Sequence, residues 1–221
     1  MACPKRAQSS VQQPSVPEKL GDLRFRTLLS EEDWAALPRA VRRRFSKRVS
    51  DGKTIVYVGK LTEVKFSRLG RWIAQALRLM GAPLPVRDDV DVPTVVTVTE
   101  DIASRGQNWT RLYANRRGFP QTINSTKRFS GPTGLEEYIG FGVSIALAVS
   151  VEDSALVFRS TGYRIGLGWI RLSLPKFLWP GALAVKHEEI SEDLFRFSML
   201  LEHPLLGQLL YQVGEYEEDL R

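Results

Sequence analysis

The stretch QTINSTKRFSGPTGLEEYIGFGVSIALAVSVEDSALVFRSTGYRI, residues 121–165, decides what kind of fold this chain can form. One face of its central run carries branched apolar side chains and the other only small ones: Val143, Ile145, Leu147, Val149 and Val151 against Ser144, Ala146, Ala148 and Ser150. Glu152-Asp153-Ser154 interrupts the run and Leu156–Ile165 resumes the alternation, which predicts a β-hairpin. The small-residue face predicts either another backbone packed closely against the strand or a cavity beside it.

Further β-patterned segments lie on both sides of this stretch. They cover residues 53–60, 94–102, 108–115 and 121–129, then 169–174, 182–189, 195–201 and 209–217. Short turns join them and crossover helices are few, so we expect an antiparallel sheet of about nine strands. The sequence therefore predicts an α+β fold that is mainly antiparallel β, curled into a barrel or a half-barrel.

Helical patterns precede most of the strands. Ser30 is a capping residue before the acidic first turn of a short helix carrying Trp34 and Leu37, and Pro38 opens a second that runs to Ser46. These two N-terminal helices are expected to cover one face of the sheet or plug one end. Residues 68–80 predict an amphipathic helix with an apolar stripe, ended by Gly81 and Pro83: Leu69, Trp72, Ile73, Ala76, Leu77 and Met80.

Composition places this chain of 221 residues among globular proteins with a real core. Residues 1–20 are rich in Pro, Ser and Gln and are predicted to be a disordered tail, which leaves 21–221 as a single domain. No run is long and apolar enough for a membrane helix, and the start has no apolar signal-peptide region. With one cysteine, Cys3, an internal disulfide framework is excluded, and a cytoplasmic location is the expectation.

The net charge of +6 raises the question of a nucleic-acid partner. A basic segment at the end of the second helix contains Arg42, Arg43, Arg44, Lys47 and Arg48, whereas the C-terminus is acidic. No helix-turn-helix, RNP or zinc-finger spacing accompanies the cluster, so we predict no nucleic-acid binding. A solvated face is its ordinary role, and one cluster is weak support for an anionic membrane surface.

Charged and aromatic side chains recur on strand faces that a curled sheet would bring together. The candidate ligand-binding residues are Trp109, Arg111, Tyr113, Lys127, Arg159 and Tyr163, and Ser125 shares the face of Lys127. Charged groups inside a sheet must be paired or bind something, so a concave arrangement predicts a pocket in which Arg111 and Lys127 hold an anionic or polar head. The alternative is that this face is the solvated outside of the sheet.

Candidates for catalysis are fewer. Glu136, Glu137 and His203 are the residues that acid–base chemistry would use, although His203 equally suits a turn in which it bonds loop carbonyls. His187 stands beside two glutamates, but adjacent strand residues point to opposite faces, so no metal site is predicted. Gly131-Pro132-Thr133-Gly134 lacks the ending of a phosphate loop and predicts a tight turn, and no cofactor motif is present.

A set of motifs resembles DUF4166, a bacterial domain of unknown function. The matching segments span about residues 23–217 and include 41–45, 57–59, 78–85, 109–111, 125–137, 158–163 and 203–207. The resemblance implies an accessory domain, because members are sometimes fused to saccharopine-dehydrogenase-like or thiol–disulfide oxidoreductase-like domains; it implies no catalytic residue. The sequence has neither a Rossmann glycine motif nor C-x-x-C, so any redox role is expected to depend on a separate oxidoreductase partner.

Three hypotheses therefore stand at this point. The first is a binding module whose β-sheet cavity holds a small, partly apolar ligand with a polar or anionic head. The second is an acid–base enzyme that uses Glu136 or Glu137 with His203. The third is an accessory domain for an oxidoreductase partner, with an exposed apolar or basic patch and no pocket behind it.

Overall fold

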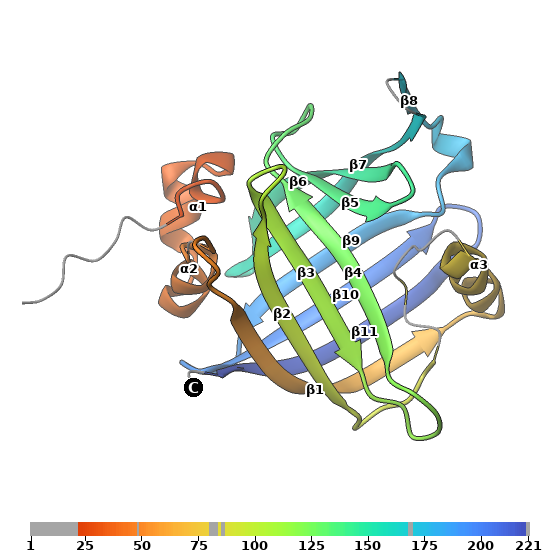
Figure 1. The fold of residues 1–221 in the computed structure, drawn as a ribbon, viewed down its shortest axis with the longest axis horizontal. Helices are drawn as coiled ribbons and strands as arrows, with labels where there is room; N and C mark the ends of the chain where they lie inside the picture. Colours follow the sequence, from red (N-terminus) through yellow and green to blue (C-terminus); the bar gives the residue numbers. More distant parts are fainter. Residues whose placement is uncertain (1–21, 48, 80–83, 85–86, 168–169, 220–221) are drawn as a thin grey trace, which may run out of the picture.

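Ten antiparallel strands of this chain close into a barrel with a simple up-and-down order (Figure 1). The computed structural model describes residues 22–47, 49–79, 84, 87–167 and 170–219. The barrel strands are β1 (Ile55–Phe66), β2 (Pro93–Asp101), β3 (Gly106–Tyr113), β4 (Gln121–Arg128), β5 (Glu136–Gly140), β6 (Val143–Glu152), β7 (Ala155–Leu167), β9 (Ala182–Glu189), β10 (Leu194–His203) and β11 (Gly207–Asp219). β1 pairs with β11 and β6 pairs with β7, so this ring of strands has no free edge.

The prediction of a mainly antiparallel sheet that curls on itself is confirmed, and the sheet closes completely. Two details differ from the pattern. The short β5 was not anticipated, because Glu136 and Glu137, which follow the predicted turn at 131–134, were not assigned to a strand. The segment at residues 169–174 is β8 (Ile170–Ser173), a short strand that pairs only with β7 and lies outside the ring.

Two N-terminal helices plug one end of the barrel, as predicted. α1 (Glu31–Ala36) begins after Ser30, whose hydroxyl accepts a hydrogen bond from the Asp33 amide at 3.0 Å, and α2 (Arg39–Phe45) begins after Pro38. The ring of Phe45 packs at a tilt against Phe158, at 5.8 Å, and edge-on against His187, at 5.0 Å, and both of those residues point into the barrel. The plug therefore supplies part of the barrel core.

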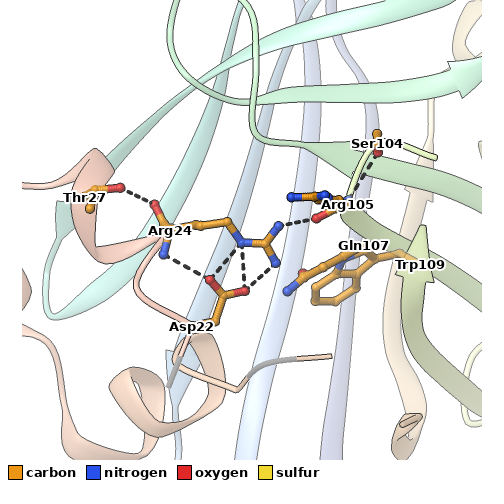
Figure 2. A network of polar contacts seen from close by, with 8 residues as sticks. Asp22, Arg24, Thr27, Ser104, Arg105, Gln107 and Trp109 are labelled. Atoms are coloured by element: carbon orange, nitrogen blue, oxygen red, sulfur yellow. Dashed lines mark hydrogen bonds and ion pairs between the residues drawn. The ribbon is translucent and has the colours of Figure 1, made fainter. Parts of the chain in front are cut away.

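A polar clamp holds the segment before the plug against the barrel (Figure 2). The guanidinium of Arg24 forms an ion pair with Asp22 and donates a hydrogen bond to the carbonyl of Arg105 in the β2–β3 turn. The amide of Asp22 in turn donates to the carbonyl of Ser46 at 2.6 Å. Arg24 also lies over the ring of Phe129 at 4.1 Å, so Asp22 and Arg24 together connect the chain entry with the end of α2 and with two barrel turns.

The basic segment of α2 is used within the molecule. Arg43 pairs with Asp193, Lys47 pairs with Glu218, and Arg44 stacks over the ring of Phe195 at 3.6 Å. Arg48, the predicted disordered tail and the predicted helix-ending residues Gly81 and Pro83 lie outside the described residues.

α3 (Arg68–Leu79) packs against β1 and β11 near the other end of the barrel (Figure 1). The predicted amphipathic helix is present, but two residues of its apolar stripe, Leu69 and Trp72, are 41% and 74% exposed. The contact is made instead through Gly70 and Ala74, because a Cβ at Gly70 would lie 1.9 Å from the Leu209 carbonyl oxygen. No helix in the described part of the chain is long and apolar enough to cross a membrane.

We expect Phe45→Ala to destabilise the protein by about 3–5 kcal/mol, because Phe45 is buried between the plug and the barrel. Phe119→Ala is the matched control, since that ring is 93% exposed, and should change the free energy of unfolding by less than about 0.5 kcal/mol. Urea unfolding measures both. Equal effects of the two substitutions would contradict the packing of α2 into the barrel end.

Candidate functional site

An apolar cavity of about 350 Å³ occupies the barrel interior behind the plug. Its wall is built from aliphatic and aromatic side chains of most barrel strands, among them Ile123, Ile145, Val185, Phe197 and Leu201. The volume lies in the range of small-molecule pockets, roughly 300–1,000 Å³. Val143 and Ile145 face this cavity, so the branched face of β6 lines it, and the small-residue face, to which Ala146 belongs, points away from it.

The strand register aligns a row of side chains, most of them polar, along the inner wall of the barrel. Lys127 on β4 pairs with Glu137 on β5. Ile145 on β6 lies between Glu137 and Tyr163 on β7 and pairs with both. Toward β3, the strand that flanks β4 on its other edge, Ser125 of β4 pairs with Trp109. Because side chains alternate along each strand, this register points Lys127 and Glu137 into the same space.

Glu137 is held by two cations and a hydroxyl. Lys127 Nζ donates to one carboxylate oxygen at 3.0 Å, and the Ser125 hydroxyl donates to the other at 2.6 Å. Arg111 donates to the Ser125 hydroxyl at 3.0 Å and places Nη2 3.6 Å from the same carboxylate oxygen. We call Arg111, Lys127 and Glu137 the interior charge triad. It carries two positive charges and one negative charge, so the cavity has an excess positive charge.

Burial and neighbouring charges shift the pKa values of Glu137 and Lys127. Burial alone would raise the pKa of Glu137, but the charges of Lys127 and Arg111 and hydrogen bonds from Ser125 and Lys127 outweigh it and lower the pKa to about 2. Burial lowers the pKa of Lys127, and Arg111 lowers it further, whereas the charge of Glu137 raises it. Lys127 Nζ also lies over the rings of Trp109 and Phe158 at 5.2 and 5.3 Å, which favours its charged form.

His187 brings one further polar group to the cavity, and the sequence did not indicate it. Its ring is buried among Phe45, Phe158 and Phe197, and its Nδ1 has no hydrogen-bond partner among the described residues. Burial first, and then the charge of Arg44, lower its pKa well below the usual value, so the imidazole is neutral at physiological pH. The sequence signal that could have placed His187 at the cavity is its two-residue spacing from Val185, which puts both side chains on the same face of β9.

The structure brings five of the six candidate ligand-binding residues to the cavity wall: Trp109, Arg111, Tyr113, Lys127 and Tyr163. Arg159 lies outside, where it is 53% exposed and paired with Glu152. The cause is a β-bulge in β7, where Ser160 and Gly162 pair with adjacent residues of β6 and Thr161 is left over. That extra residue turns Arg159 away from the face that Tyr163 occupies.

The candidate catalytic residues do not meet. Glu137 faces the cavity, whereas its neighbour Glu136 points to the other side of β5, where it pairs with Arg164 beneath Gly131. His203 is the last residue of β10, and its Nδ1 accepts a hydrogen bond from the Leu205 amide at 3.2 Å, rather than bonding a loop carbonyl as the sequence suggested. In the part of the chain that the structure describes, no group of His, Cys, Asp and Glu residues has an arrangement that holds a metal ion.

Tyr163 closes the wall near the mouth of the cavity. Its hydroxyl donates to the carbonyl of Gly181 at 2.8 Å, between the short helix η2 (Lys176–Leu178) and β9. Burial raises the pKa of this tyrosine to about 12, so it remains a neutral donor. Leu178 both lines the cavity and is 56% exposed, so the cavity reaches the surface at this point.

Comparison with known proteins gives one match. The family model described as a domain of unknown function, DUF4166, matches residues 37–216, which include all ten barrel strands except the last residues of β11. No curated protein and no solved structure matches the chain.

We expect Glu137→Gln to lower stability by on the order of 3 kcal/mol at neutral pH, because two buried cations lose their counter-charge. The pKa of Glu137 is lowered on folding, so its contribution is present above its unfolded pKa of about 4.5 and is lost as pH falls toward 2. The difference in the free energy of unfolding between wild type and variant should therefore shrink below about pH 4.5.

Urea titrations at a series of pH values measure this difference. Glu152→Gln is the control, because its ion pair with Arg159 is exposed and should contribute less than about 1 kcal/mol. A Glu137→Gln effect as small as the control, or one that does not change with pH, would show that the triad is not the buried ion network described above.

Proposed function

The chain belongs to the DUF4166 family, whose description names no activity, and we therefore propose a function from the cavity itself: the barrel binds a small amphipathic anion. The observation that carries the proposal is the excess positive charge of the triad inside an apolar space. An unbalanced charge in such a space is costly unless a counter-charge enters.

The wall of the cavity indicates the rest of the ligand. Beyond the triad, its lining is almost wholly aliphatic or aromatic, which suits an alkyl or flat apolar body rather than a sugar or a nucleotide. Arg111 is the triad cation with the longer contact to Glu137, so its guanidinium is the group most available to a second anion. The Nδ1 of His187, which has no hydrogen-bond partner in the part of the chain that the structure describes, gives the cavity one further polar atom for a polar head.

Acid–base catalysis by the residues considered above is less well supported. Such a mechanism needs its acid and its base within hydrogen-bond reach of one space. Only Glu137 borders the cavity, and its pKa of about 2 makes it a poor proton acceptor near neutral pH. The geometry therefore favours binding over turnover.

The test is a comparison of two ligands with the same alkyl chain. We expect decanoate to bind with an affinity that follows the interior charge, which is 0 in Arg111→Met, +1 in the wild type and +2 in Glu137→Gln. Arg111→Met should lose about ten- to a hundredfold in affinity, because a desolvated charge contact is removed. The Lys127–Glu137 pair remains in that variant, so it is expected to fold.

Decanol is the matched control ligand and should bind all three proteins within about threefold, because it fills the same apolar wall without a charge. Isothermal titration calorimetry measures the affinities, and urea unfolding verifies that each variant is folded. Equal losses for decanoate and decanol in Arg111→Met would mean that the triad only shapes the wall. Absence of binding by both ligands in the wild type would overturn the proposal.

Decanoate affinity should also fall at alkaline pH. The carboxylate binds beside protonated Lys127, whose pKa is lowered by burial, so the loss should begin below the usual lysine pKa of about 10.4. Lys127→Arg keeps its charge throughout this range, and its decline should move to higher pH. The same decline in both proteins would assign the titration to another group.

A further inference from the structure

Large apolar side chains are exposed at one end of the barrel, the end opposite the plug. We call six of them, one from each of six segments, the apolar rim: Trp72, Phe119, Phe141, Leu172, Phe177 and Leu205. Their exposed fractions run from 53% for Leu172 to 93% for Phe119. A single exposed apolar residue needs no explanation, but a group gathered on one end of a molecule marks a binding surface.

Strand order brings the rim together. Strands alternate in direction, so every second connection of an up-and-down barrel lies at the same end. The β3–β4, β5–β6 and β10–β11 turns therefore share an end with α3, β8 and η2, as can be followed on the right of Figure 1. At the plug end, exposed Leu23, Ile102 and Ile190 stand on the entry segment and on two separate turns.

Cations interrupt the rim along the sequence. Arg117 is two residues before Phe119, Arg171 is next to Leu172, and Lys176 is next to Phe177. All three cations are exposed, and none forms an ion pair with another described residue.

Two acids at this end are paired with cations, and Glu202 near the end of β10 is exposed and forms no ion pair with another described residue. Asp88 pairs with Arg71 at 2.6 Å, and Asp91 pairs with Lys60 at 3.3 Å. The rim therefore presents apolar tips with free positive charges between them.

We infer that this rim docks the protein on an anionic lipid bilayer. Apolar tips set among lysines and arginines are what an interfacial surface requires, since the tips enter the acyl boundary and the cations meet acidic headgroups. A groove for a peptide or a partner helix would instead need a continuous apolar trough, whereas the rim residues stand on three turns, two helices and one short strand. Charge complementarity selects an anionic bilayer over a neutral one.

The cavity mouth lies beside one member of the rim. Leu178, which borders the opening, follows Phe177 directly in η2. An amphipathic anion that leaves the cavity while the rim is docked would pass into the bilayer without crossing water. This transfer rests on the proposed function, whereas the docking rests on the exposed side chains alone.

Vesicle flotation of the full chain tests the docking. We expect the protein to float with vesicles of phosphatidylcholine plus phosphatidylglycerol at low salt, and to float poorly with phosphatidylcholine alone or at high salt. Phe119→Ser with Phe177→Ser should reduce partitioning by about tenfold or more, because two apolar anchors are removed. Ile102→Ser with Ile190→Ser is the matched control at the plug end and should float like the wild type.

Decanoate binding without vesicles separates the two proposals. The rim variant should bind decanoate like the wild type, because neither phenylalanine lines the cavity. A wild type that binds decanoate but does not float would overturn the docking and leave the proposed function in place.

Equal losses in the rim and control variants would also overturn the docking. So would a lipid-free dimer in analytical ultracentrifugation that only the rim variant dissociates, since a second copy would then cover this end.

Discussion

The interior of this barrel depends on how one carboxylate is held. Glu137 is removed from water on the inner face of β5, and it is ionised there only because Lys127, Arg111 and Ser125 contact it. Breaking a buried ion network by removing one member is costly, because the remaining charge keeps its desolvation penalty without its partner. The triad therefore constrains the register of β3, β4 and β5, since a slip of one residue would turn these side chains outward.

The two ends of the barrel have different physical tasks. The plug end is closed by aromatic packing of Phe45 on Phe158 and His187 and by the polar clamp of Asp22 and Arg24, so water is excluded from the triad on that side. The other end exposes its apolar side chains and leads to the cavity through the region of Leu178. Low dielectric behind the plug strengthens the field of the excess charge, and the opposite end provides the access that an anion needs.

Much of this was predictable from the sequence, and the exceptions have physical causes. Two-residue alternation predicted the strands and placed Trp109, Arg111 and Tyr113 on one face. The pairing of β3 with β4 places Lys127 on the same inner face. The same rule failed at Arg159, because a bulge at Thr161 changes which side of β7 faces inward, and a bulge leaves no mark in an alternation of side chains. The helical pattern predicted α3 correctly but did not show which residues of its apolar stripe are buried. Helical spacing reports an apolar face but not its partner, and Leu69 and Trp72 face outward because Gly70 makes the close contact with β11. His187 was missed because its surroundings come from four other elements, which no local pattern shows.

Neither the cavity nor the triad is the most stable way to fill a barrel interior. Protein interiors are normally filled to the density of organic crystals, so space of this size forfeits packing contacts that a few larger side chains would supply. A buried ion network is likewise often matched or exceeded in stability by apolar residues of similar volume. Each feature alone makes the fold less stable than an apolar, fully packed interior would be. Together they form a space whose shape suits an apolar body and whose charge suits an anionic head, because an anion entering beside Arg111 both fills the volume and balances the charge. A ligand of that kind would remove both costs at once, and this is why the arrangement is better explained by binding than by folding.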